Sequence, residues 1–385
     1  MSEITFYNMW RTASAQHRAA LLERMKGDAP TLASKAGFVS MTVLECAEDG
    51  RVLVEGRWQS KDAFDAAVAG NPDAQRSRAS LEEFGSPAPG LFTEVFRVSP
   101  GESMIVADPS ALIEENYAEV NGQTIHYLKA GAGPALVLVH GYPESSETWR
   151  RIMPELAKKF TVIAPDTRGV GHSSLADNFT LEEIADDVYE LVKSLGFRQV
   201  CLVGQDFGVQ IVSAYAAKHR ADVSALVVIE SPLSAFGLEE LFGSFWHFGF
   251  LASPFAEMLI SGKEKEFFKA FAFDAFVFRK EAFSQSDIER YILNQTRPGR
   301  LKAGLAYYRA LLAGKDFFAK TVAPPWTFPV LAIDSEHTMN GLTAKSFERV
   351  APGTKSVIAP DCGHFVQEEQ PEFLIKTLLD FLPQE

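Results

Sequence analysis

Five short runs of apolar residues, separated by longer stretches of helical pattern, constrain the fold of most of this chain. Each run is apolar along its whole length rather than alternating, which is the pattern of a strand buried on both faces. The runs cover residues 135–139, 160–164, 200–203, 225–229 and 330–333. Continuous apolar strands separated by helices predict a parallel sheet with helices on both sides, the α/β class.

Two segments depart from this rhythm. Before the first run, residues 117–120 and 123–128 flank Asn121-Gly122, which predicts a β-hairpin with a type I′ turn. Between the last two runs, residues 232–321 are helical in pattern, rich in phenylalanine and too long for a loop. We therefore expect an inserted helical cap over 232–321 and an α/β core formed by 116–231 and 322–385.

The N-terminal part, residues 1–98, follows another order. Strand and helix patterns alternate there as β-α-β-β-α-β, which predicts a ferredoxin-like α+β domain, and the turn-rich residues 99–115 are expected to be a linker. Gly37-Phe38 and the segment 58–64 resemble the antibiotic-biosynthesis-monooxygenase-like family. Domains of that family usually pair through their sheets, so the resemblance implies a homodimer formed by this domain.

Charge and cysteine content exclude several classes of function. The formal charge of −13 disfavours nucleic acid and anionic membranes as partners, because both would repel the surface. The N-terminal residues lack the pattern of a signal peptide and no apolar run reaches the ~20 residues of a membrane span, so we expect a cytoplasmic protein. Cys46, Cys201 and Cys362 are widely separated, which predicts neither a disulfide framework nor a zinc site.

The hexapeptide 203–208, Val-Gly-Gln-Asp-Phe-Gly, is the clearest chemical motif. Gly204 and Gly208 flank Asp206 in the G-x-nucleophile-x-G pattern of a strained turn between a strand and a helix. Such a turn holds the central side chain above the carboxyl edge of the sheet, where an aspartate can attack carbon and form an ester. For so short a motif, the structural alternative is a buried aspartate that caps the helix.

Further candidate residues follow the other strands. The turn 140–145 places the backbone N–H of Tyr142 where it can join that of Phe207 in an oxyanion hole. His364 lies in a late loop after the last strand, the position of a general base. Two acids can orient this histidine, because Glu230 ends one strand and Asp334 ends the next. Both are positions that the orienting acid can take.

Together these motifs resemble the epoxide hydrolase and dehalogenase branch of the α/β-hydrolases, over residues 117–385. The resemblance implies that Asp206 is the nucleophile and His364 the base, without a metal or organic cofactor. It favours Glu230 as the orienting acid, because the segment 229–232 is similar to epoxide hydrolases that recruit a glutamate from this strand. Asp334 is the alternative.

Within that branch, the neighbours of the nucleophile distinguish the reactions. Haloacetate dehalogenases carry arginines just after the nucleophile, and haloalkane dehalogenases usually carry a tryptophan as halide donor, whereas this chain has Phe207 and Gln210. Segments 245–250 and 304–309 are similar to cap segments of epoxide hydrolases. His247 and Tyr308 match the members that donate hydrogen bonds to the epoxide oxygen from a His and Tyr pair, with Tyr307 as the alternative if the register differs by one.

The sequence therefore predicts an epoxide hydrolase that forms an ester on Asp206 and hydrolyses it with water activated by His364. The phenylalanine-rich cap indicates a small apolar or aromatic epoxide. One alternative is a haloalkane or haloacid dehalogenase that uses the same aspartate. Another makes the N-terminal domain a cofactor-free monooxygenase or small-ligand binder, with His17, Trp10 and Trp58 as its candidates, although core packing explains the tryptophans more simply.

Overall fold

The structure is a computed structural model that describes residues 4–11, 21–23, 25–26, 30, 33–36, 38–46, 51–68, 92–98, 105–106 and 113–383. The chain divides into two compact units, Met1–Leu112 and Ile113–Glu385. The boundary lies within the segment 99–115 that was expected to be a linker. His17 lies outside the described residues.

The first unit holds an antiparallel sheet in the order β1-β3-β2-β4-β5. Trp58 is buried in its core and packs edge-on against Phe38, as expected for a core residue. The ferredoxin-like arrangement is not shown, because β4 pairs with β2 rather than with β1. The elements are β1 (Ile4–Arg11), β2 (Phe38–Cys46), β3 (Arg51–Trp58), α2 (Lys61–Val68), β4 (Phe92–Val98) and β5 (Ile105–Val106).

The second unit is built on an eight-stranded sheet in the order β13-β12-β11-β10-β8-β9-β7-β6. Strands β9, β8, β10, β11, β12 and β13 are parallel, and the hairpin β6–β7 is added antiparallel at one edge. All five apolar runs lie in this sheet, so the predicted α/β fold is confirmed. The strands are β6 (Glu114–Val120), β7 (Gln123–Ala130), β8 (Ala135–Val139), β9 (Thr161–Pro165), β10 (Val200–Gln205), β11 (Val223–Ile229), β12 (Val330–Ser335) and β13 (Lys355–Ala359).

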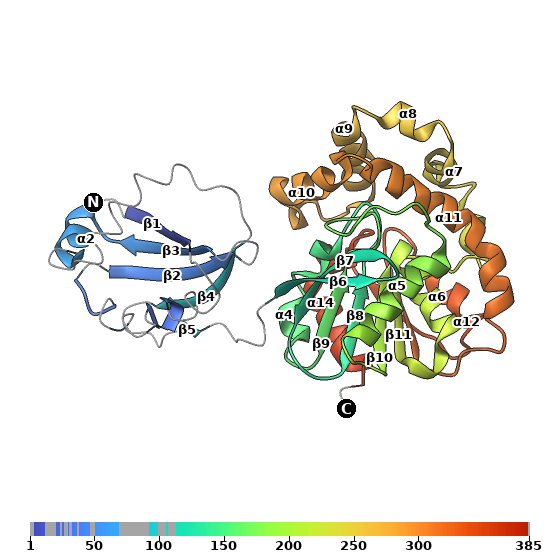
Figure 1. Ribbon diagram of the computed structural model, residues 1–385, viewed down its shortest axis with the longest axis horizontal. Coiled ribbons are helices and arrows are strands. Elements are labelled where there is room, and N and C mark those ends of the chain that lie inside the picture. The colour runs from blue at the N-terminus through green and yellow to red at the C-terminus, as the bar shows by residue number, and fades with distance from the viewer. Residues whose placement is uncertain are drawn as a thin grey trace. The chain divides into compact units, whose positions relative to one another are not determined.

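Helices cover both faces of this sheet, because its central strands are apolar on both sides (Figure 1). In β8, Val137 and Val139 face one core while Leu136 and Leu138 face the other. Helices α5 and α6 pack in the first core and α4 and α14 in the second. The helices that flank the sheet are α4 (Met153–Leu156), α5 (Leu181–Ser194), α6 (Phe207–Lys218), α12 (Leu342–Glu348), α13 (Val366–Glu369) and α14 (Pro371–Phe381).

Local signals in the sequence account for two of the element boundaries. The hairpin turn is as predicted, with φ of 50° at Asn121 and 73° at Gly122. Thr180 and Glu183 form a reciprocal capping box at the start of α5. Strand β13 was not anticipated, because it lies at the edge of the sheet and exposes most of its residues.

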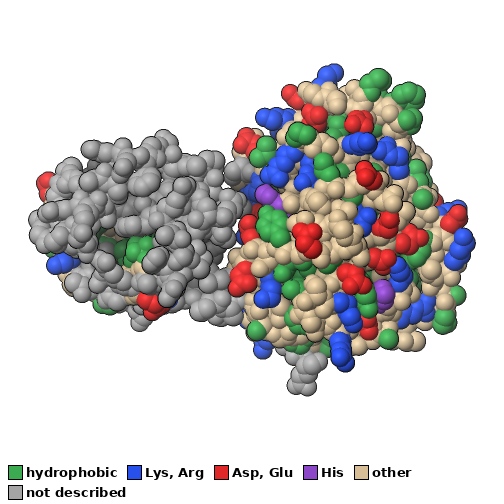
Figure 2. Space-filling model, viewed as in Figure 1, with side chains coloured by type: hydrophobic (Ala, Val, Ile, Leu, Met, Phe, Trp, Pro, Cys, Tyr) green, Lys and Arg blue, Asp and Glu red, His purple; other side chains and the backbone are tan. Residues whose placement is uncertain are grey.

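The chain between β11 and β12 forms a helical segment, residues 238–321, at one end of the sheet (Figure 1). Hydrophobic side chains gather on its outer side near α8 (Figure 2), where Phe255, Met258 and Leu259 are more than half exposed. Within the described residues, no helix is long and apolar enough to span a membrane. The segment contains α7 (Trp246–Ala252), α8 (Ala256–Ile260), α9 (Glu264–Phe268), α10 (Gln285–Thr296) and α11 (Arg300–Thr321).

Candidate active site

Asp206 occupies a strained turn between β10 and α6. Its backbone has φ 52° and ψ −117°, a conformation that costs a non-glycine residue about 1–3 kcal/mol. The flanking glycines make the turn possible. A Cβ added at Gly208 would lie 2.1 Å from the carbonyl oxygen of Val139, and one at Gly204 would lie 2.4 Å from that of Gly208.

The carboxylate of Asp206 points toward other candidate residues and makes no capping hydrogen bond to α6. Its Oδ1 accepts a hydrogen bond from the backbone N–H of Tyr142 at 3.1 Å, and its Oδ2 lies 3.4 Å from His364 Nε2. About a quarter of the side chain is exposed. This geometry argues against the capping alternative, because the carboxylate is left accessible to a small molecule.

Glu230, rather than Asp334, contacts the histidine. Its Oε2 lies 3.1 Å from His364 Nδ1, and its side chain is fully buried. Asp334 instead accepts hydrogen bonds from the backbone N–H groups of Thr343 and Ala344, at the start of α12. Burial raises the pKa of Asp334 to about 6, partly opposed by its hydrogen bonds. The structure thus assembles Asp206, His364 and Glu230 in one chain of contacts.

The two carboxylates determine the charge of His364. Burial alone would lower the pKa of this histidine, but hydrogen bonds and charge from Asp206 and Glu230 outweigh burial and raise it to about 10. His364 is therefore an imidazolium at neutral pH. Loss of either negative charge would favour the neutral imidazole.

His247 and Tyr308 lie on the helical segment, and both line the same pocket as Asp206. Their ring centroids are 6.2 Å apart. Burial lowers the pKa of His247 to about 4, so the imidazole is neutral at pH 7, and burial holds the pKa of Tyr308 well above 10. Both side chains can therefore donate a hydrogen bond without carrying charge.

The adjacent tyrosine has a different role. The hydroxyl of Tyr307 donates to the backbone carbonyl of Arg168 at 2.8 Å, away from the pocket lining. Of the two adjacent tyrosines, Tyr308 therefore lines the pocket. Gly304, one turn earlier in α11, allows the helix to pack closely against the Tyr142 ring, because a Cβ there would lie 2.3 Å from that ring.

Aromatic and aliphatic side chains form most of the remaining pocket wall. None of the residues that line this pocket, all within the described second unit, is arginine, lysine or tryptophan. A substrate carboxylate would find no arginine or lysine there, and a halide would find no indole N–H. The apolar wall consists of Phe207, Pro232, Leu238, Leu241, Phe245, Phe248, Phe271, Ala272, Phe276, Leu311, Met339 and Phe365.

Several supporting residues were not anticipated from the sequence. Gln205 donates to the backbone carbonyl of His364 at 3.2 Å, and the N–H of His364 donates to the carbonyl of Phe276 at 3.0 Å. Ser335 and Thr338 donate to the carboxylate of Glu230. Ser335 and Thr338 lie outside any motif, and Gln205 occupies an unspecified position of the G-x-nucleophile-x-G pattern. The sequence therefore carries no signal of these contacts, which depend on how distant loops meet.

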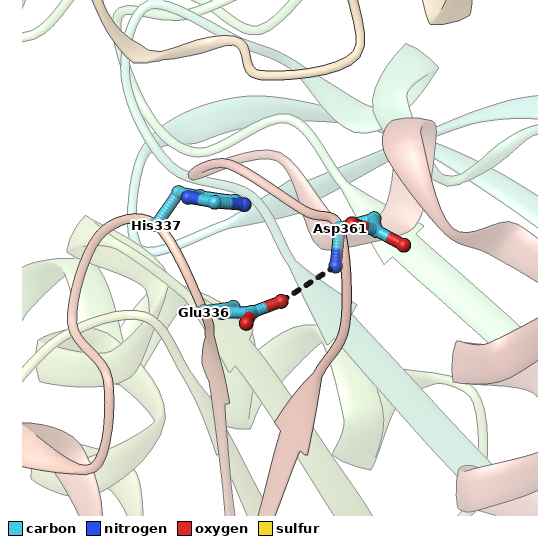
Figure 3. Close-up of side chains that lie close together, drawn as sticks. All are labelled: Glu336, His337 and Asp361. Carbon is cyan, nitrogen blue, oxygen red and sulfur yellow. Dashed lines mark hydrogen bonds between the residues drawn. The ribbon is translucent and has the colours of Figure 1, made fainter.

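Glu336, His337 and Asp361 form a separate exposed cluster of possible metal ligands (Figure 3). One carboxylate oxygen of Glu336 already accepts a hydrogen bond from the backbone N–H of Asp361 at 3.0 Å. The His337 ring stacks on Phe278, with 3.7 Å between ring centroids. These three residues do not line the pocket that contains Asp206.

Comparisons with known proteins place most of this chain in one fold family. The model of the alpha/beta hydrolase fold family matches residues 134–371. A soluble epoxide hydrolase of Corynebacterium sp. (strain C12) is 31% identical over 71% of this chain and 98% of its own length. A fluoroacetate dehalogenase of Burkholderia sp. is 30% identical over 51% of this chain and 69% of its own length. The solved structure of the epoxide hydrolase CorEH without ligand superposes with a TM-score of 0.66 and 31% identity, over 70% of this chain and 98% of that one.

Proposed function

Because this chain belongs to the α/β-hydrolase fold family, we propose that it is an epoxide hydrolase that converts a small apolar or aromatic epoxide to a vicinal diol. One observation carries this proposal. Asp206 shares a largely apolar pocket with two neutral donors, His247 and Tyr308, while the His364 and Glu230 pair contacts its carboxylate from another side. In this proposal residues 232–321 act as a cap that supplies the donors.

The first step forms an ester. An oxygen of the Asp206 carboxylate attacks an epoxide carbon, and the C–O bond of the strained ring breaks. The departing oxygen takes a proton from Tyr308 and a hydrogen bond from His247, whose Nε2 is the donor because Nδ1 is enclosed without a hydrogen-bond partner among the described residues. Ester formation removes the negative charge of Asp206, so the pKa of His364 falls and the imidazolium gives up its proton, which restores the Tyr308 hydroxyl.

The second step hydrolyses the ester. His364, now neutral and oriented by Glu230, accepts a proton from water as the water oxygen attacks the ester carbonyl carbon. The N–H groups of Tyr142 and Phe207 stabilise the oxyanion, and the diol leaves with the proton from His364. The proton left on the Asp206 carboxyl passes to His364 and restores the imidazolium, so the starting state returns and the cycle adds one water.

The same site argues against a dehalogenase. Fluoroacetate carries a carboxylate, and the described pocket lining offers no arginine or lysine to bind it. Incubation with separate panels of epoxides and organohalides tests this choice, with diol measured by chromatography and halide by ion electrode. We expect diol from aryl or alkyl epoxides and no halide release; halide release without diol would favour the dehalogenase.

We propose that the first unit is an antibiotic-biosynthesis-monooxygenase-like module that forms a homodimer. An antiparallel sheet with a small core of its own supports this assignment. Light scattering should show a dimer for the full chain and a monomer for a chain that begins at Asp108, with epoxide hydrolysis retained. A truncated chain that stays dimeric would refute dimerisation through this unit. Oxygen consumption on phenolic substrates by the full chain would favour the monooxygenase alternative.

A further inference from the structure

The last residue of β12 and the loop after it surround the carboxylate of Glu230 with donors. The backbone N–H of Ser335 donates to Oε1, and the hydroxyl of Thr338 donates to Oε2. His364 Nδ1 lies 3.1 Å from this same Oε2. Thr338 therefore binds the oxygen that orients the histidine.

The hydroxyl groups can be assigned a direction. The Ser335 and Thr338 hydroxyl oxygens are 2.5 Å apart, and either can be the donor between them. A hydroxyl has one hydrogen, and an ionised carboxylate can only accept. If Thr338 gives its hydrogen to Glu230, the hydrogen between the hydroxyls must come from Ser335. The result is a chain of donors that runs from Ser335 through Thr338 to Glu230.

This loop is also attached to the segment that carries His364. The N–H of Glu336 donates to the carbonyl of Ala359 at 3.1 Å, and the N–H of His337 donates to that of Cys362 at 3.2 Å. The contact between Glu336 and the N–H of Asp361 adds a third link (Figure 3). Thr338 and His364 thus lie on two loops that are joined to each other, with Glu230 between them.

We propose that Thr338, with the Ser335 hydroxyl behind it, is a positioning residue that holds Glu230 in the orientation that His364 needs for ester hydrolysis. This inference rests on the proposed function. Without the threonine hydroxyl, Oε2 keeps a single donor, and the carboxylate can rotate away from the direction that aims His364 at water. Attack by Asp206 on the epoxide does not use this contact, so only the second step should change.

The test follows both steps in the full-length protein by rapid quench with styrene oxide and intact-mass detection of the ester. Thr338→Val should form the ester at the wild-type rate and hydrolyse it about 10- to 100-fold more slowly, the kinetic equivalent of one hydrogen bond to a charged group. Thr338→Ser keeps the hydroxyl and should restore hydrolysis. Ser335→Ala keeps the backbone donor and should slow hydrolysis less than Thr338→Val does.

Thr354→Val is the matched control, because Thr354 is half-buried and its hydroxyl donates only to the carbonyl of Ala351. It should leave both steps unchanged. Hydrolysis at the wild-type rate in Thr338→Val, or equal slowing of both steps, would overturn the positioning role. If Thr338→Val does not fold, wild-type hydrolysis in Ser335→Ala would overturn it. Absence of any ester in the wild type and in His364→Gln would instead refute the proposed function.

Discussion

The two sides of the pocket differ in charge and in origin. Asp206, Glu230 and His364 come from loops at the ends of sheet strands and are coupled by charge, which raises the pKa of His364 to about 10. His247 and Tyr308 come from the helical segment and are neutral, because burial lowers the pKa of the histidine to about 4 and raises that of the tyrosine. In the proposed mechanism this difference separates two tasks, since the charged side makes and breaks the ester and the neutral side protonates the leaving oxygen.

Removal of the nucleophile tests the charged side most severely. Asp206→Ala should lower kcat for epoxide hydrolysis by about 10⁴-fold or more, the scale of loss for a covalent catalyst. Diol formation measured by chromatography checks this, with circular dichroism as the control for folding. The variant keeps the strained backbone of this turn, because alanine also has a Cβ. Retained turnover would refute the covalent mechanism.

The choice of acid is the next sharpest test of the charged side. Glu230→Gln should reduce kcat by roughly 10³-fold, because the amide cannot stabilise the imidazolium form of His364. Asp334→Asn is the matched comparison, and it should leave the kinetics within about twofold because Asp334 binds the start of α12 instead. Steady-state kinetics on one epoxide distinguish the two. The reverse ranking would assign the orienting role to Asp334.

The neutral side is tested by removing one donor at a time. Tyr308→Phe should slow ester formation about 10²- to 10³-fold, the usual loss for one donor to a developing oxyanion. Tyr307→Phe, which removes the hydroxyl bound to the carbonyl of Arg168, should affect stability rather than the chemical step. Pre-steady-state ester formation and urea unfolding give the two readouts. Equal slowing by both variants would show that α11 acts only through packing.

The smallest expected effect is the pH dependence of stability. His364 has a pKa of about 10 in the folded protein and an ordinary value of 6.5 when unfolded, so its charge stabilises the fold fully below pH 6.5. That contribution is lost as the pH rises toward 10. The difference in free energy of unfolding between wild type and His364→Gln should therefore shrink from pH 6 to pH 9.5 in urea titrations. A difference that does not vary with pH would mean that the charge coupling is weak.

The sequence predicted the two sides of the pocket unequally. The apolar runs and the motif around Asp206 were sufficient for the sheet and the nucleophile turn, because continuous hydrophobicity and flanking glycines are local signals. Two acids remained possible for His364, since only the meeting of loops decides which carboxylate contacts the ring. The contacts of Ser335 and Thr338 with Glu230 could not be predicted for the same reason. Strand patterns also do not encode which distant strands pair. They could therefore not predict that β4 of the first unit pairs with β2, which differs from the expected ferredoxin-like arrangement.

Intact mass spectrometry of His364→Gln with separate epoxide and organohalide panels tests the central claim most directly. This variant should form the Asp206 ester but fail to hydrolyse it, so the protein should gain the full mass of an epoxide. An adduct equal to an organohalide minus hydrogen halide would contradict the account and assign a dehalogenase. No adduct from either panel would contradict the covalent mechanism for these substrates.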